Sequence, residues 1–165
     1  MPTFRFNVVD VFTDTPLQGN QLAVFTDARE IPEDKLQDLA REVGFSETVF
    51  VYPATAEGAH ARIRIFTPGI EVPFAGHPTL GSAFVLAGPL QLGEIRLETG
   101  SGVVPVRLER EGARIVFGRM DQPIPTVVAY EDEAELLGAI GVERSELPVE
   151  VYDNGLRNLF VVLGS

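Results

Sequence analysis

The segment Gly76-His77-Pro78 combines residue types that can bind and protonate a small anion. It ends an irregular loop and precedes a small, apolar run that we expect to form a buried helix over residues 77–88. Gly76 allows close backbone approach, His77 occupies the expected N-cap position, and Pro78 suits the first helical position because it lacks an N–H group. Free N–H groups and the helix dipole would attract a carboxylate or phosphate, and the imidazole could donate a proton. The segment is equally consistent with a simple loop-to-helix turn and a capping histidine.

A second candidate for chemistry is Glu47, which opens the strand-like run 47–53. Strand alternation places Glu47 on the same face as Val49 and Val51, so its carboxyl group would stand at the entrance of a buried strand. A glutamate in such a place can act as general base and acid near neutral pH. The alternative is an exposed strand end or an ion pair with an arginine, and this segment alone favours that alternative.

Three other segments contain residues that could bind a ligand. Gly19-Asn20 joins two predicted strands, and Asn20 offers a donor and an acceptor to a carboxylate, although an ordinary turn is the simpler explanation. Asp10 lies among apolar neighbours within a strand, where its expected task is to hold a loop by hydrogen bonds. The glycine-rich run 100–102 precedes a hairpin and no helix, so we do not expect it to bind an anion.

The chain contains no cysteine and two histidines, which narrows the possible chemistry. Without thiols there are no disulfides, thiolate metal ligands or thiol nucleophiles, and racemisation by two thiols is excluded. A histidine-rich metal site is not expected, and His60 lies in a turn where we expect it to face solvent. Any proton transfer must therefore use a carboxylate or a histidine.

Separated segments of the chain together resemble one known family. They are, in order, Asp10-Val11-Phe12-Thr13, Gly19-Asn20-Gln21-Leu22-Ala23-Val24-Phe25, Ser46-Glu47-Thr48-Val49-Phe50-Val51, Arg64-Ile65-Phe66-Thr67-Pro68 and Phe74-Ala75-Gly76-His77-Pro78-Thr79-Leu80-Gly81. This order is similar to that of the phenazine-biosynthesis PhzF-like family, whose fold is similar to diaminopimelate epimerase. The resemblance is strong over residues 3–120 and weak over residues 121–165.

The resemblance implies a cofactor-independent isomerase or epimerase that moves a proton on a small carboxylic acid. It assigns the role of general base and acid to Glu47 and the binding of substrate to Asn20, Gly76 and His77, with no metal. It also implies a second domain built like the first, with the site in the cleft between them. Because no second glycine-rich loop of this kind follows residue 120, the sequence leaves open a non-catalytic half-enzyme, or a binding or assembly module that needs a second half.

Composition limits the class of protein further. The chain has 165 residues, of which 45% are hydrophobic and 22% charged, as in an ordinary globular protein. Its net charge of −11 argues against a nucleic-acid partner, since no basic stripe offsets phosphate repulsion. The sequence has no apolar run long enough to span a membrane and no signal-peptide pattern at its start, so we expect a cytoplasmic protein without a membrane partner.

The periodicity predicts an α+β fold in which a mainly antiparallel sheet wraps around the central apolar helix, and the resemblance makes this one half of a diaminopimelate epimerase-like fold. A second, amphipathic helix is expected over residues 33–43, closed by Gly44. Strands are expected at 3–13, 20–26, 47–53, 61–67, 94–99, 103–110 and 113–120, the last three as antiparallel hairpins.

Prolines near residue 122 place the predicted domain boundary there. We expect residues 1–121 to form an epimerase-like domain that carries the candidate base, and residues 122–165 to begin a second, incomplete domain. This second part should contain a helix over 132–141 and a hairpin that turns at Asp153-Asn154-Gly155. The apolar run 158–163 would leave a strand edge uncovered, which favours a homodimer or pairing with a separately encoded second half.

Overall fold

The computed structural model describes residues 3–122 and 124–164 and divides into two compact units, Met1–Gln122 and Pro123–Ser165. The first unit is built on an 8-stranded sheet with the order β1-β2-β3-β4-β6-β7-β8, and β5 pairs with β4. The pairs β2–β3 and β4–β6 are parallel and the other pairs of this sheet are antiparallel. The strands are β1 (Asn7–Val11), β2 (Asn20–Phe25), β3 (Glu47–Tyr52), β4 (Ala61–Phe66), β5 (Glu71–Val72), β6 (Glu94–Thr99), β7 (Gly102–Glu111) and β8 (Arg114–Met120).

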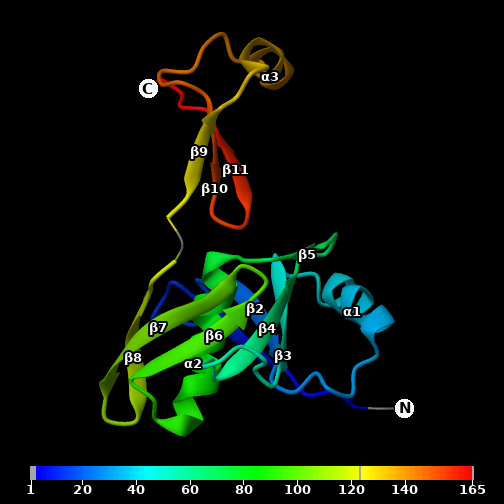
Figure 1. Ribbon diagram of the computed structural model, residues 1–165, viewed down its shortest axis with the longest axis vertical. Coiled ribbons are helices and arrows are strands. Elements are labelled where there is room, and N and C mark those ends of the chain that lie inside the picture. Colours follow the sequence, from blue (N-terminus) through cyan, green and yellow to red (C-terminus); the bar gives the residue numbers. More distant parts are fainter. Residues whose placement is uncertain (1–2, 123, 165) are drawn as a thin grey trace. The chain divides into compact units, whose positions relative to one another are not determined.

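Helix α2 (Gly76–Leu90) runs along the inner side of this curled sheet, as the apolar sequence predicted. It packs against β1, β2, β3, β6, β7 and β8, and Figure 1 shows it behind the last three of these strands. Gly81 allows a close approach to the sheet, because a Cβ atom there would lie 2.7 Å from side-chain carbons of both Leu22 and Val11. The main hydrophobic core therefore lies between this helix and the sheet.

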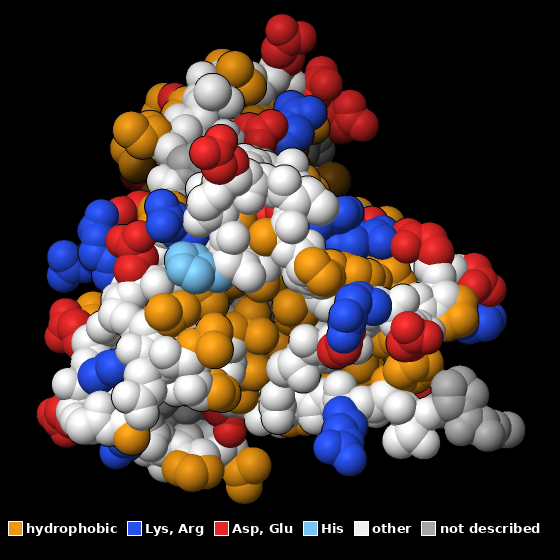
Figure 2. All heavy atoms as spheres, turned by 60° about the horizontal axis from the view of Figure 1, so that its bottom comes forward, with side chains coloured by type: hydrophobic (Ala, Val, Ile, Leu, Met, Phe, Trp, Pro, Cys, Tyr) orange, Lys and Arg blue, Asp and Glu red, His pale blue; other side chains and the backbone are white. Residues whose placement is uncertain are grey.

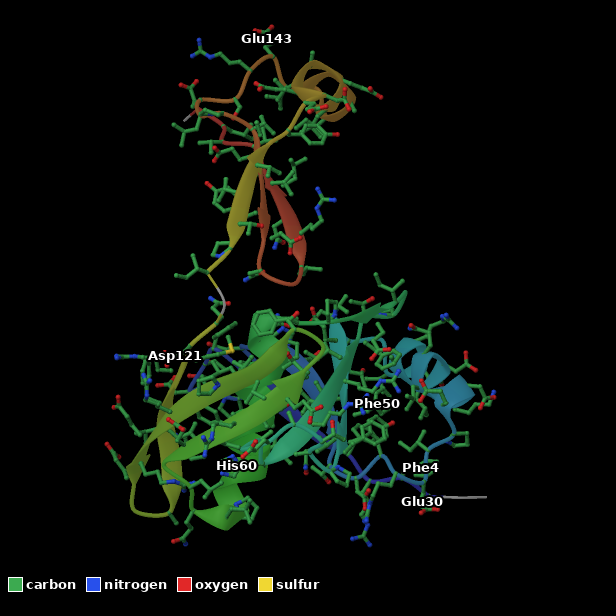
Figure 3. The ribbon with its side chains drawn as sticks, in the orientation of Figure 1. Phe4, Glu30, Phe50, His60, Asp121 and Glu143 are labelled. Atoms are coloured by element: carbon green, nitrogen blue, oxygen red, sulfur yellow. The ribbon has the colours of Figure 1, made fainter. Side chains whose placement is uncertain are left out.

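Helix α1 (Leu36–Val43), preceded by the short 3-10 helix η1 (Glu33–Lys35), packs on the other side of β3 and β4. Its buried Leu36 joins a smaller core with Phe50, which Figure 3 shows beside α1. The helix ends at Gly44, whose φ of 72° is the predicted left-handed C-cap. Strand β3 thus sends Phe50 toward α1 and Val49 toward α2, and alternation puts Glu47 on the α2 side.

Three details of the first unit differ from the sequence-based expectation. Helix α2 begins at Gly76 with Ala75 as its N-cap, so His77 is the second helical residue and the predicted N-cap position was wrong. Strand β1 is shorter than the predicted strand 3–13 at both ends, and it ends at Val11 because the φ of 66° at Phe12 is far from strand geometry. Strand β5 was not predicted, since a pair of residues is too short to show alternation.

The second unit is a 3-stranded antiparallel sheet with the order β11-β10-β9 and one helix. Its elements are β9 (Thr126–Ala129), α3 (Glu133–Ile140), β10 (Glu150–Asp153) and β11 (Arg157–Phe160). The predicted hairpin is β10–β11, and the Asp153 carboxylate accepts a hydrogen bond from the N–H of Gly155 at 2.9 Å in its turn. Strand β9 was not predicted, because the prolines before it argued for a linker.

Within the described ranges, no helix combines the length and the apolar character that crossing a membrane requires.

Candidate active site

The predicted site residues stand at the beginnings of three elements of the first unit. Asn20 is the first residue of β2, Glu47 is the first residue of β3, and Gly76 and His77 open α2. Because β2 and β3 are parallel, with Leu22 paired to Glu47, these two strands start at the same edge of the sheet. The sheet order therefore gathers segments that are far apart in the sequence.

Glu47 and His77 form the centre of the site. Nδ1 of His77 lies 3.3 Å from Oε2 of Glu47, and the side chains are only 8% and 18% exposed, respectively. Among the residues that the structure describes, Oε2 of Glu47 and Nε2 of His77 are buried and have no hydrogen-bond partner. Buried polar atoms in proteins are nearly always paired. Within the same described ranges, the hydroxyl oxygens of Thr48 and Ser82 are also buried without a partner, so it is the contact between the Glu47 and His77 side chains that marks a place where a ligand can supply the partners.

The start of α2 offers backbone donors next to this pair. Ala75 is extended, with a φ of −151°, and its carbonyl accepts both the N–H and the hydroxyl of Thr79, at 3.4 and 2.8 Å. Pro78 has no N–H, so the N–H groups of Gly76 and His77 are the donors left at the start of the helix. Residues 76–80 contain no acidic side chain, so within the helix nothing neutralises the positive end of the dipole, which favours an anion such as the neighbouring Glu47 carboxylate or a ligand.

Asn20 is connected to the neighbour of the candidate base. The hydroxyl of Ser46 donates a hydrogen bond to Oδ1 of Asn20 at 3.1 Å. With its oxygen engaged, the amide of Asn20 keeps its two N–H donors for a ligand. The residue before Asn20 must be glycine, because a Cβ atom at position 19 would lie 2.5 Å from the carbonyl oxygen of Val11. The Gly19-Asn20 turn thus places an amide beside the strand that carries Glu47.

Sequence reasoning missed two side chains near these residues. The ring of Phe12 lies 6.5 Å from the imidazole of His77, centroid to centroid, and 73% of the residue is exposed. The Cε atom of Met120 lies 3.7 Å from the position that a Cβ atom would take at Gly76. Nothing local in the sequence could have indicated either contact, because both depend on how strands β1 and β8 end beside α2.

The side chains of Asp10 and His60 form hydrogen bonds with the backbone. Oδ2 of Asp10 accepts a hydrogen bond from the N–H of Leu17 at 2.8 Å, which confirms that Asp10 holds a loop. His60 is exposed, as predicted, and its Nδ1 accepts the N–H of Arg96 at 3.0 Å; it is labelled in Figure 3. We assign neither residue a part in the chemistry.

A second charged cluster, centred on Arg64, is fully paired. Its guanidinium donates two hydrogen bonds to Glu71, at 2.7 and 2.6 Å, and one to Glu33 at 2.6 Å. These hydrogen bonds raise the pKa of Arg64 above its ordinary value, and the bond from Arg64 lowers the pKa of Glu33. The cluster joins η1 to β4 and β5 and engages Nε, Nη1 and Nη2 of the guanidinium, so we assign it a role in the fold.

Comparison with known proteins now identifies the family. The model of a family described as "Phenazine biosynthesis-like protein" matches residues 9–165. The chain belongs to this family. One relative is the trans-2,3-dihydro-3-hydroxyanthranilate isomerase of Pseudomonas aeruginosa. It is 47% identical to this chain over 161 residues. That alignment covers 98% of this chain and 58% of the relative, so the chain spans less than two thirds of the relative's length.

Solved structures agree with the fold and the family. A Pseudomonas aeruginosa structure described as a "Predicted Epimerase" has a TM-score of 0.82 and 34% identity, covering 96% of this chain and 59% of that one. A probable proline racemase from Agrobacterium radiobacter has a TM-score of 0.68 and 14% identity. The match covers 96% of this chain and 52% of the racemase chain, and at such low identity it shows the fold alone. The predicted α+β, epimerase-like fold and the predicted family are thus confirmed.

Proposed function

We propose that this chain supplies the catalytic carboxylate of an isomerase that moves a proton on a small carboxylic acid. Glu47 would take a proton from one carbon of the substrate and return it to another. The observation that carries the proposal is the buried, unpartnered Oε2 of Glu47, 3.3 Å from Nδ1 of His77. A base of this kind must reach the substrate directly or through one water, and an oxygen that accepts no hydrogen bond from the protein has a lone pair available for the proton.

The start of α2 would bind the substrate carboxylate in this reaction. The N–H groups of Gly76 and His77 and the helix dipole favour a negative charge there, and the amide of Asn20 can donate to the same group. The relative from Pseudomonas aeruginosa is named for an anthranilate, which is itself a carboxylate. We include no cofactor in this proposal, because one carboxylate can both remove and return the proton.

The proposal is tested by following solvent deuterium. The chain is supplied with the remaining part of a family member as a second polypeptide, and trans-2,3-dihydro-3-hydroxyanthranilate is incubated with it in D2O. We expect deuterium to enter the substrate carbon skeleton, and Glu47→Gln to slow this entry by at least about 10²-fold, since the amide keeps the shape but cannot accept the proton.

Glu42→Gln is the matched control, because Glu42 is an exposed glutamate on α1, away from the site. This variant should exchange deuterium at the wild-type rate. Undiminished exchange by the Glu47→Gln protein would show that another group moves the proton.

A second candidate function is a binding or assembly module that does not catalyse. It is favoured by Nε2 of His77, which is buried without a hydrogen-bond partner in the part of the chain that the structure describes and could bind a carboxylate without transferring a proton. In that case the purified chain alone should bind small carboxylates through Asn20, Gly76 and His77 without converting them. Turnover by the chain alone would contradict this second candidate.

We further propose that the chain pairs with a second copy or with a separately encoded second half. In the second unit the side chains of β9 and β11 are exposed, among them Val128 and Phe160, at 55% and 54%. In the view of Figure 2, hydrophobic side chains are visible at the surface with charged side chains around them. Exposed apolar surface and open strand edges favour association. Light scattering at micromolar concentration checks this, and a stable monomer would contradict it.

A further inference from the structure

Two glycines in the turn between β6 and β7 are needed for different reasons. Gly102 has a φ of 111°, and a Cβ atom there would meet nothing within 4 Å. Gly100 does not have a left-handed φ, but a Cβ atom there would lie 2.8 Å from Cα and 3.1 Å from the carbonyl oxygen of Pro73. Both are backbone atoms, which cannot rotate away as the end of a side chain can. Position 100 is therefore a glycine because the backbone of Pro73 passes directly against it.

Pro73 begins the short connection between β5 and α2. It follows Val72, the last residue of β5, and only Phe74 and Ala75 separate it from Gly76, where α2 begins. Phe74 is 1% exposed and Ala75 is 8% exposed, so both are held by their surroundings. A buried connection this short has little slack, because each residue spans at most about 3.3–3.6 Å. A displacement of Pro73 is therefore passed on to the start of α2.

Strand β4 sets the connection and the candidate base relative to each other. On one edge of β4, Phe66 pairs with Thr48, the residue after Glu47. On the other edge, Phe66 pairs with Glu71 of β5. The candidate base and the beginning of the connection thus flank the same end of β4. How far the start of α2 lies from Glu47 depends on the path that the connection takes from there.

The pairing of β5 gives this path little support by itself, because β5 has only two residues. Strands β5 and β6 lie along the same edge of β4, at Ile65–Phe66 and Ala61–Arg62, respectively. A cleft of about 480 Å³ is lined by residues of both strands and by Pro73 and Gly100. The contact between Gly100 and Pro73 therefore links the β6–β7 turn to the connection beside this cleft.

We propose that Gly100 is a positioning residue for the Glu47–His77 pair, because it seats Pro73 and so fixes the start of α2 opposite Glu47. Its consequence for catalysis rests on the proposed function. An alanine at position 100 must move from 2.8 Å to the 3.4 Å of ordinary contact, a shift of about 0.6 Å. Catalytic groups must be held to within about 0.5 Å, so a shift of this size at Pro73 is large enough to matter.

The first test needs no substrate and uses the imidazole NMR signals of the purified chain. The sequence contains only two histidines, so His77 reports on the site and His60 serves as an internal reference. We expect Gly100→Ala to shift the signals of His77 and to leave those of His60 in place. Gly102→Ala is the matched control, because it strains the same turn through its positive φ but meets nothing. It should leave both histidines at their wild-type positions.

The second test measures the consequence for the reaction, at a temperature where both variants are folded. With the second polypeptide and the substrate described above, Gly100→Ala should slow deuterium entry by about 10- to 100-fold, as expected when reacting groups are misplaced by up to an ångström. Gly102→Ala should exchange deuterium at the wild-type rate. A turn that only stabilises the fold would give the same rate in the two folded variants.

A second pair of variants covers the case in which Gly100→Ala does not fold. Pro73→Gly loosens the other side of the contact without adding atoms, and it should also shift the signals of His77. Pro53→Gly is its control, since Pro53 is likewise exposed but follows the far end of β3, outside the connection. It should leave the His77 signals unchanged.

The remaining outcomes overturn the positioning role of Gly100. Unshifted His77 signals in Gly100→Ala, or in Pro73→Gly where Gly100→Ala does not fold, would show that the contact does not set the start of α2. Equal effects of Gly100→Ala and Gly102→Ala would make the turn a purely structural element. Shifted signals with deuterium entry at the wild-type rate would show that the reaction does not need this seat. An inactive wild-type pair would overturn the proposed function alone, since the NMR comparison does not require turnover.

Discussion

Nδ1 of His77 lies 3.3 Å from Oε2 of Glu47, although strand β4 and strand β5 separate the two residues along the chain. The contact exists because β3 and α2 face each other across the main core, and both elements begin at the same end of it. The carboxylate that is proposed to move a proton is thus next to an imidazole and to the amino end of a helix.

The first prediction concerns the two histidines. His77→Gln should slow isomerisation by about 10²- to 10³-fold, the range found when one donor is removed from a site that stabilises developing negative charge. The assay is the deuterium exchange described above, with the second polypeptide present. His60→Gln should have no effect, since His60 is exposed and bonds only to the backbone of Arg96. Equal losses in the two variants would point to an effect on folding.

The second prediction tests the packing of α2 with a pair of glycine substitutions. Gly81→Ala should lower the free energy of unfolding by about 1–3 kcal/mol, because its Cβ would lie 2.7 Å from side-chain carbons of Leu22 and Val11. Gly138→Ala in α3 meets nothing within 4 Å and should instead raise helix stability by up to about 1 kcal/mol. Urea denaturation measures both. Unchanged stability of Gly81→Ala would mean that α2 can move away from the sheet.

The third prediction concerns the loop that carries Phe12. Asp10→Ala removes the acceptor of the Leu17 N–H, which should cost about 1 kcal/mol and speed hydrogen exchange at that amide. Asp10→Asn keeps an acceptor oxygen, so its effect should be smaller. Asp14→Ala is a control on the same loop, because Asp14 accepts only the hydroxyl of Thr15. Exchange as slow in Asp10→Ala as in the wild type would show that other contacts hold the loop.

The fourth prediction concerns pH and the Arg64 cluster. In the folded protein the hydrogen bond from Arg64 keeps the pKa of Glu33 below its ordinary value. The ion pair therefore stabilises the fold above the ordinary glutamate pKa, and this stabilisation is lost as the pH falls through the lowered folded pKa. Arg64→Gln should return the pKa of Glu33 toward its ordinary value, as carbon NMR titration of the carboxyl would show. Arg41→Gln, which removes a contact with Asp38 only, should leave that pKa unchanged.

Several features of this protein were predictable from short stretches of sequence, because neighbouring residues decide them. Alternation in the run that begins at Glu47 predicted which face of β3 the carboxylate occupies, since side chains in a strand point to alternate sides. Gly44 predicted the end of α1, because few other residues adopt a positive φ without strain. The order of the motifs predicted the family, and its family model matches residues 9–165.

Other features could be decided only by contacts between distant segments. Which residue comes to lie beside Glu47 depends on the path of α2 inside the curled sheet, and no local pattern encodes that path. The positive φ of Phe12 opposes the residue's own preference, and it occurs in a segment held by tertiary contacts of Asp10 and Gly19. The sequence alone therefore determined the elements and the residues able to do chemistry, whereas long-range packing decided which of them meet.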